Sequence, residues 1–151
     1  MQKLRLLVIA FFFSGILNAQ DTGEFNFAFN HLAMSVKDVD RSADFYSNVL
    51  NLKEITNRSK LEGVRWFTLA EGKELHLISI VKENVIINKA VHLALATANF
   101  DAFVARLDKL NIAYSDWPGV NHKVNIRADG IKQIFFQDPD GYWIEVNSIG
   151  K

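Results

Sequence analysis

The sequence predicts an α+β protein built from two βαβββ modules. Two parts of the chain resemble later parts in the same order: residues 31–35 resemble 92–96, at an offset of 61, and residues 66–80 resemble 135–149, at an offset of 69. Each copy carries an alternating strand pattern, an amphipathic helix pattern and three further strands. With 49% apolar and 23% charged residues, the composition suits one globular domain.

The first module begins with a strand over residues 27–36, where apolar side chains alternate with small or polar ones. A helix capped by Asp38 or Asp40 follows and ends at Asn51, a residue type that tolerates the left-handed conformation. Its apolar stripe consists of Val39, Ala43, Tyr46, Val49 and Leu50. Strands are expected near 52–58, 63–70 and 74–82, the last two joined as a hairpin through 70–73.

The second module repeats this design. After the strand that carries His92, a helix begins at the cap Asn99 and ends at Asn111. Its buried side consists of Phe100, Phe103, Val104, Leu107 and Leu110. Strands are expected near 112–116, 131–137 and 141–148, with a long loop over 117–130 and a tight turn over 138–141.

The N-terminus has the pattern of a secretory signal peptide. Lys3 and Arg5 precede an apolar run over 6–17, and small or polar residues follow it up to Ala19 and Gln20. The run is short of the roughly 20 residues that a membrane-spanning helix needs. We expect cleavage after residue 19, a periplasmic or secreted product, and no stable membrane anchor after cleavage. Residues 20–151 then form one domain, with module one at about 24–82 and module two at about 83–151.

Charge and cysteine content exclude several classes of function. The chain has 17 basic and 17 acidic residues with no run of Lys or Arg, so a nucleic-acid partner is not expected. It has no Cys, which excludes disulfides, a cysteine nucleophile and thiolate-bound metals. A small-molecule partner is expected, and any metal must be bound by His and carboxylates.

Four side chains at repeat-related positions form a candidate metal centre. The repeat aligns His31 with His92 and His76 with Glu145, and each lies on the strand face opposite to the bulky apolar residues. A pseudo-two-fold arrangement would bring the four to one point. Three imidazoles and one carboxylate suit one divalent ion, Zn²⁺, Ni²⁺, Fe²⁺, Mn²⁺ or Co²⁺. The alternative is three ordinary half-buried histidines and an exposed glutamate.

Further residues are candidates for substrate binding. Trp66 points toward the expected site, and Trp143, on the same strand face as Glu145, would line it. Arg127 and Lys132 flank the loop before the seventh strand and would bind an anionic group, while His122 in that loop would act as an acid or base. The alternatives are a core or interface role for the tryptophan and a solvated loop for the others.

Three segments carry a resemblance to a known family. They are FNHLAMSVKDVDRSADFYSNVLNL, VHLALATANFDAFVARLDKLNI and QIFFQDPDGYWIEV, and the resemblance that they carry covers essentially all of the chain after residue 19. In order and content they resemble the vicinal oxygen chelate superfamily, which includes glyoxalase I, methylmalonyl-CoA epimerase, extradiol dioxygenases, fosfomycin-resistance transferases and bleomycin-resistance proteins. The resemblance implies two βαβββ modules that form a cupped, partly open mixed β-sheet around a divalent metal.

The resemblance also implies roles for the four candidate ligands. Extradiol dioxygenases and fosfomycin-resistance enzymes use the equivalents of His31, His92 and Glu145, whereas glyoxalase I and the epimerase fill all four positions. Glyoxalase I usually has a carboxylate or amide where this chain has His76, so one of its candidate bases is absent here. Glu145 is the first choice as catalytic base, with Glu62 in reserve.

Several functions are compatible with this resemblance. The leading expectation is an exported metal-dependent lyase or isomerase of glyoxalase type, which moves a proton through a metal-stabilised enolate or enediolate of a small oxygen-rich substrate. The alternatives are an Fe(II) dioxygenase and a non-catalytic protein that binds a drug or metabolite. A homodimer is expected, and the metal site lies either within one chain or between two.

Overall fold

The computed structural model describes residues 28–81, 83 and 85–149. The first half contains β1 (His31–Ser35), α1 (Val39–Asn48), β2 (Lys53–Ile55), β3 (Val64–Thr68) and β4 (Glu74–Ile78), with a 3-10 turn at Ala70–Gly72. The second half contains β5 (His92–Ala96), α2 (Phe100–Lys109), β6 (Asn125–Ile126), β7 (Lys132–Gln137) and β8 (Trp143–Asn147). The two βαβββ modules are therefore confirmed. The segment assigned as a signal peptide lies outside the described residues, and no described helix is long and apolar enough to cross a membrane.

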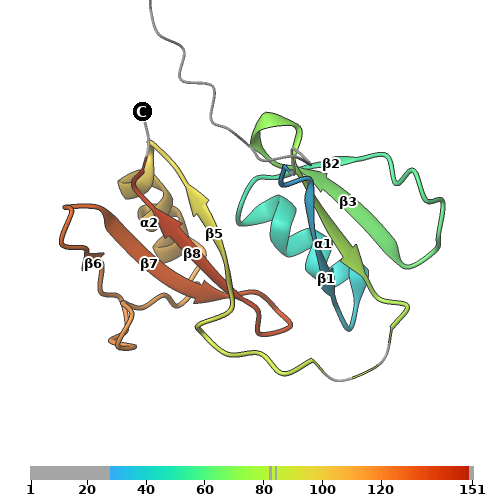
Figure 1. The fold of residues 1–151 in the computed structure, drawn as a ribbon. Helices are drawn as coiled ribbons and strands as arrows, with labels where there is room; N and C mark the ends of the chain where they lie inside the picture. The colour runs from blue at the N-terminus through green and yellow to red at the C-terminus, as the bar shows by residue number, and fades with distance from the viewer. Residues whose placement is uncertain (1–27, 82, 84, 150–151) are drawn as a thin grey trace, which may run out of the picture.

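Each module forms one mixed four-stranded sheet, and the two sheets lie side by side without closing into one (Figure 1). The strand orders are equivalent, β1-β4-β3-β2 and β5-β8-β7-β6. In both sheets the first strand runs parallel to the last strand of its module, and the other pairs are antiparallel. The sequence repeat thus corresponds to a repeat in topology.

The helix ends follow the sequence signals with two exceptions. The Asp38 carboxylate accepts hydrogen bonds from the backbone N–H groups of Asp40 and Arg41 at 3.0 Å, which makes Asp38 the cap of α1. Asn51 and Asn111 adopt positive φ angles of 56° and 52° after the two helices. Asn99 precedes α2, but its side chain makes no capping hydrogen bond. Leu110, expected on the buried side, is 43% exposed because it lies beyond the last helical turn.

One apolar core joins the two modules. Met34, Phe67, Leu75 and Leu77 from the first sheet and Ile134, Phe136, Ile144 and Val146 from the second belong to a single buried cluster. The rings of Phe45 in α1 and Phe103 in α2 lie 6.3 and 5.9 Å from the Phe136 ring. These residues alternate along their strands with the candidate ligands, so the opposite face of each sheet is left for the site.

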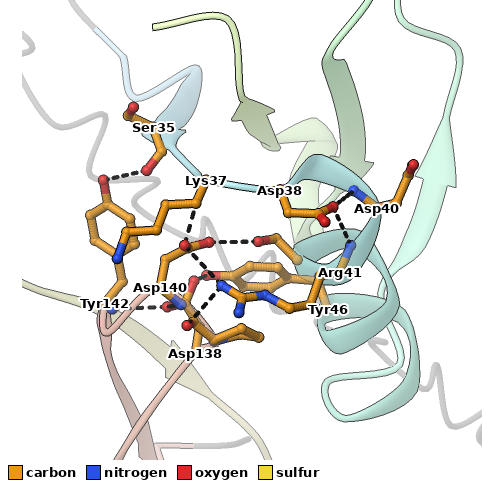
Figure 2. A network of polar contacts seen from close by, with 11 residues as sticks. Ser35, Lys37, Asp38, Asp40, Arg41, Tyr46, Asp138, Asp140 and Tyr142 are labelled. Atoms are coloured by element: carbon orange, nitrogen blue, oxygen red, sulfur yellow. Dashed lines mark hydrogen bonds and ion pairs between the residues drawn. The ribbon is translucent and has the colours of Figure 1, made fainter. Parts of the chain in front are cut away.

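A polar network fixes the β7–β8 turn of the second module to α1 of the first (Figure 2). Asp138 accepts hydrogen bonds from the Tyr46 hydroxyl at 3.0 Å and from the backbone N–H groups of Asp140 and Tyr142. Asp140 accepts from the Ser42 hydroxyl at 2.7 Å and pairs with Arg41 at 3.1 Å. We call this set the inter-module clamp; with the shared core it holds the two modules in a fixed relation.

The edge of the second sheet differs from the expectation. Residues 112–116 were expected to form a strand, but only Ser115 pairs, in isolated bridges with Asn121 and Phe135. The Asp116 carboxylate accepts hydrogen bonds from the N–H groups of Gly119 and Val120, which turns the chain back immediately. The edge strand is instead β6, inside the segment expected to be a long loop.

The strand expected near 52–58 is shorter for a similar reason. Only Lys53–Ile55 pairs as β2, because Asn57 organises a turn directly after it. The Asn57 amide donates to the carbonyl groups of Leu61 and Val64, and its oxygen accepts from the Ser59 N–H. By satisfying three backbone groups, the Asn57 side chain competes with strand pairing and favours a turn.

Candidate metal centre

The candidate ligands lie on the sheet faces opposite to the helices, as the strand register requires. In the first sheet Ala33 of β1 and Trp66 of β3 are the register partners of His76. In the second sheet Ala94 of β5 and Phe135 of β7 are the register partners of Glu145. His31 shares a face with Ala33, and His92 with Ala94. We call these the first and second ligand faces.

On the first ligand face, aromatic rings form a column. The His76 ring stacks on the Trp66 ring with centroids 4.0 Å apart, and the His31 ring stacks on the other side of His76 at 4.3 Å. Arg58 covers the far side of Trp66, with its guanidinium carbon 4.6 Å from the ring centroid. Glu74 joins the column from the edge, because it accepts from His76 Nε2 at 2.8 Å and from Arg58 at 2.7 Å. These hydrogen bonds from Arg58 and His76 lower the pKa of Glu74.

On the second ligand face, His92 and Glu145 form a close pair. His92 Nε2 lies 3.3 Å from Glu145 Oε2, and both side chains are largely buried. The other nitrogen of His92, Nδ1, lies 2.9 Å from the Lys89 carbonyl oxygen, an acceptor, so Nδ1 carries the proton. The other carboxylate oxygen of Glu145, Oε1, accepts from the Asn147 amide at 2.9 Å. Both ligand candidates are thus held by a second residue, which leaves Nε2 and Oε2 facing each other.

A single chain does not bring the four predicted ligands to one point. Within residues 28–81, 83 and 85–149, no three His, Asp or Glu side chains are grouped closely enough to hold one metal ion. His31 lies with His76, and His92 with Glu145, on two separate sheets. An open cleft of about 940 Å³ lies between the modules and is lined by His92 but by none of the other three. The prediction that the four ligands meet at one point within one chain is therefore wrong for this structure.

Lys89 occupies the second ligand face beside the His92–Glu145 pair. Its ammonium donates hydrogen bonds to the carbonyl oxygens of Asp116 and Trp117, at 2.6 and 3.0 Å, and to the Ser115 hydroxyl. It also lies 4.6 Å from the Phe135 ring centroid and 4.8 Å from that of Trp143. Burial lowers the pKa of Lys89, although the charge of Asp116 opposes this. The lysine ties the chain between the modules to the ligand face.

The other predicted substrate-binding residues divide into two groups. Trp66 and Trp143 lie on the two ligand faces, as expected, beside His76 and Lys89. Trp66 Nε1 is the one buried side-chain donor or acceptor without a hydrogen-bond partner among the described residues. The two tryptophans therefore lie on different ligand faces, Trp66 on the first and Trp143 on the second.

Arg127, Lys132 and His122 are not brought to the ligand faces by this structure. Arg127 pairs with Asp129 at 2.7 Å within its own turn. Lys132 shares a strand face with the core residue Ile134 and pairs with Asp101 of α2 at 2.9 Å. His122 is exposed and lies 3.2 Å from Asp108. Their nearest charged partners explain these positions without a substrate.

Sequence reasoning missed Lys89, Glu74 and Arg58. Glu74 lies two residues before His76 and so shares its strand face. The alternation of side chains along a β-strand would have predicted this position. Lys89 and Arg58 lie outside the regular elements, and no spacing rule predicts their contacts across the chain.

His92 and Glu145 could contribute two ligands to a divalent metal, and no third His, Asp or Glu among the described residues joins them. His92 Nε2 and Glu145 Oε2 lie 3.3 Å apart, and an imidazole nitrogen and a carboxylate oxygen are both atoms that bind divalent metals. Metal-binding histidines typically donate their second ring N–H to a carbonyl or carboxylate, which is the contact that His92 makes with Lys89. His31 is held in the same manner, with Nδ1 2.7 Å from the Asn30 side-chain oxygen.

Comparisons with known proteins identify the family and support the fold. The chain is 26% identical over 123 residues to Glyoxylase I 4 of Arabidopsis thaliana, a match that covers 78% of this chain and 68% of the relative. It is 29% identical over 122 residues to the metallothiol transferase FosB of Shouchella clausii, covering 79% and 78%. The structure of the fosfomycin resistance protein FosX from Listeria monocytogenes superposes with a TM-score of 0.63 at 21% identity, covering 82% of this chain and 93% of that one. Residues 28–146 match the family model, and the chain belongs to the Glyoxalase/Bleomycin resistance protein/Dioxygenase superfamily.

Proposed function

We propose that this protein is a metal-dependent lyase or isomerase of glyoxalase type that transfers a proton on a small oxygen-rich substrate. The observation that carries the proposal is the close approach of His92 Nε2 and Glu145 Oε2, two side chains that are each held in place from their other side. The similarity to a glyoxylase and to a metallothiol transferase supports a metal-dependent enzyme rather than a passive binder.

Glu145 is the residue that moves the proton in this proposal. Asn147 holds Oε1, and the reactive oxygen Oε2 lies 3.3 Å from His92 Nε2. A bound divalent ion supplies Lewis-acid polarisation of the substrate oxygens, which makes an adjacent C–H more acidic. Trp66 and Trp143 supply the apolar walls that exclude water from the reacting centre.

We propose further that two copies of the chain share each site, with His31 from one and His92 and Glu145 from the other. The inter-module clamp and the common core oppose a rotation that would turn the two ligand faces toward each other within one chain. A second copy can present its first ligand face to the second face of its partner without breaking these contacts. A symmetric dimer contains two such sites.

Mixing two inactive variants tests the shared site. His31→Phe and Glu145→Ala each damage every site of their own homodimer, but a mixed dimer regains one intact site out of two. Co-refolding them in equal amounts is expected to restore up to a quarter of the wild-type Co²⁺ content, because half of the dimers are mixed. His92→Phe mixed with Glu145→Ala is the matched control, since both changes affect the same half and no intact site forms. Equal recovery in the two mixtures contradicts the shared site, and no metal in the wild-type protein contradicts the proposed enzyme.

The two alternative functions give different results in the same preparation. An Fe(II) dioxygenase consumes oxygen when the iron-loaded protein meets a catechol, whereas a lyase or isomerase does not. A non-catalytic binder retains its ligand after chelation and in Glu145→Ala. These assays use untagged protein, so that a histidine tag does not add metal.

Export is a separate part of the proposal. It is supported by Lys3 and Arg5 followed by the apolar run over 6–17. Expression in a bacterial host and N-terminal sequencing of the periplasmic fraction test it. A mature N-terminus at Gln20 agrees with the proposal, and a full-length protein in the cytoplasm contradicts it.

A further inference from the structure

The ammonium group of Lys89 lies in a cage of aromatic rings and neutral oxygens. Three rings surround its Nζ, with centroids 4.6, 4.8 and 5.7 Å away: those of Phe135, Trp143 and Trp117. Two backbone carbonyls and one hydroxyl accept hydrogen bonds from it, at 2.6, 3.0 and 3.3 Å: those of Asp116, Trp117 and Ser115. We call residues 115–117, 135 and 143 the ammonium cage.

The cage matches the chemistry of a primary ammonium group. Such a group has three N–H donors and no acceptor, and the three oxygens supply one acceptor for each donor. The faces of aromatic rings attract its positive charge, most strongly where water is excluded. A quaternary ammonium has no N–H group and leaves the three oxygens unpaired, and a neutral alcohol gains no attraction of a charge to the rings. The cage therefore selects a primary ammonium by its charge and by its donors.

The walls of the cage are held by the second module itself. Ser115 exchanges two backbone hydrogen bonds with Phe135 of β7, and the Phe135 ring is fully buried. The Asp116 carboxylate accepts hydrogen bonds from two N–H groups of the turn that follows it. None of these contacts involves Lys89. The cage is thus preformed, and we expect it to persist when the lysine side chain is removed.

The lysine that fills the cage comes from an exposed connection between the modules. In this connection Ile86 is 93% exposed, and the N–H of Val91 donates to the carbonyl of Asn88, within the connection. The Lys89 ammonium, in contrast, reaches acceptors 26 to 28 positions further along the chain. Trp117, one wall of the cage, is 48% exposed. A ligand can therefore approach beside Trp117 and displace the lysine without breaking a strand or a helix.

The cage adjoins the His92–Glu145 pair. Phe135 is the register partner of Glu145, and its ring centroid lies 5.6 Å from that of His92. Trp143 lies two residues before Glu145 and so shares its strand face. A ligand held in the cage by its ammonium group therefore lies beside the pair.

We infer that the ammonium cage is a binding site for a primary alkylammonium ligand, and that Lys89 occupies it as an internal substitute until the ligand displaces it. This group occurs in small amines and in the lysine side chains of peptides. The inference requires neither a metal nor the proposed reaction, because the cage contains none of the four candidate metal ligands. A free ligand competes with a tethered ammonium, whose effective concentration is on the order of 1 mM.

Lys89→Ala empties the cage, and n-butylammonium chloride probes it, because its chain matches the four-carbon stem of lysine. We expect n-butylammonium to raise the midpoint of thermal unfolding of Lys89→Ala until the site is saturated, and to bind roughly 10-fold more tightly than neutral n-butanol. Butyltrimethylammonium, which has the charge but no N–H group, is expected to bind more weakly than n-butylammonium. Sodium chloride at equal concentration controls for ionic strength. No saturable effect of n-butylammonium, or equal binding of n-butanol, overturns the inference.

Two tryptophan substitutions in the Lys89→Ala background locate the bound ammonium. Trp143→Leu removes one wall of the cage and is expected to weaken the binding of n-butylammonium several-fold. Trp66→Leu is the matched control, because Trp66 lies on the first ligand face, and is expected to leave the Kd unchanged. If the two substitutions weaken binding equally, or neither does, the ligand is not in the cage and the inference is wrong.

A lysine peptide distinguishes the two sources of the ammonium group. The acetylated amide of Gly-Lys-Gly is titrated into Lys89→Ala beside n-butylammonium. Tighter binding of the peptide assigns the cage to lysine side chains of a partner, and tighter binding of n-butylammonium assigns it to a small amine. Failure of both to bind overturns the inference.

Proton NMR of the wild-type protein gives a readout that does not require any variant to fold. The three rings are expected to shift the Hε resonances of Lys89 away from their ordinary positions. Addition of n-butylammonium is expected to return them toward those positions as the side chain leaves the cage, whereas n-butanol leaves them unchanged. Unchanged resonances at about 0.1 M n-butylammonium, roughly 100 times the effective concentration of the tethered lysine, contradict the displacement.

Discussion

The hydroxyl of Tyr46 is expected to be a major source of stability, because it connects the two modules through a buried carboxylate. Tyr46 has no exposed surface, and its hydroxyl donates to Asp138 Oδ2 at 3.0 Å (Figure 2). Tyr46→Phe removes this donor and leaves the rest of the ring packed as before. A hydrogen bond to a charged group contributes about 1.5–3 kcal/mol, so the free energy of unfolding is expected to fall by about that amount at pH 7. The midpoint of thermal unfolding then falls by roughly 4–10 °C.

The loss in Tyr46→Phe is expected to depend on pH. Burial raises the pKa of Asp138 above its ordinary value, while hydrogen bonds from Tyr142 and Tyr46 act in the opposite direction. Without the Tyr46 hydroxyl the pKa of Asp138 rises further. A carboxyl whose folded pKa is raised contributes stability at low pH that is lost as the pH rises through that pKa. The deficit of the variant is therefore largest above the pKa of Asp138 and shrinks below it.

Urea denaturation at several pH values measures both effects. Tyr142→Phe is the matched control, because its hydroxyl donates to a neutral acceptor, the Ser35 carbonyl, at 2.8 Å. We expect it to lose only about 0.5–1.5 kcal/mol, with little dependence on pH. If Tyr46→Phe loses no more than Tyr142→Phe, or if its deficit grows toward low pH, the reasoning about the buried carboxylate is refuted.

Three further predictions concern other parts of the molecule. Lys89→Met is expected to lower the free energy of unfolding by about 1–3 kcal/mol, because three acceptors lose their donor; a chemical denaturation curve equal to that of wild type contradicts this. Arg65→Gln is expected to raise the pKa of Glu54, which hydrogen bonds from Arg65 lower, so its loss of stability disappears as the pH falls through the pKa of Glu54. Carbon NMR of the carboxyl follows the titration, and an unchanged pKa rejects the assignment. Removal of the metal from the loaded protein with EDTA is expected to lower the midpoint of thermal unfolding, since an ion at 100 times its Kd stabilises the folded state by about 2.7 kcal/mol; no shift speaks against a native metal site.

The sequence was informative where structure depends on local periodicity. Alternation along the strands assigned Met34 to the core and His31 to the opposite face, and the aspartates of the turn at 138–141 were placed at the β7–β8 connection. The expected strand at 112–116 was wrong, because the Asp116 side chain folds the chain back there. Strand propensity carries no information about such a side-chain contact.

The candidate site could be predicted in part for the same reason. Periodicity identifies which face a ligand occupies, but the relation between two sheets depends on contacts distant in sequence. The hydrogen bond between Ser42 and Asp140 joins residues 98 positions apart, and Arg106 reaches the carbonyl of Val49 across 57. Nothing in the two repeat units taken separately encodes how they pack against each other. The stack of His76 between Trp66 and His31 is likewise a result of packing.

The fixed relation between the modules has a consequence for how the protein would acquire and lose its ion. If each metal site needs residues from two chains, an isolated chain supplies only two ligands to the ion. The residence time of the ion is then limited by the lifetime of the dimer. The fraction of sites that hold an ion then falls when the protein is diluted, even at a constant concentration of free metal. The reason is that two chains must associate to form each site. In dilute solution, such a protein would exchange its ion with the surroundings each time the pair separates.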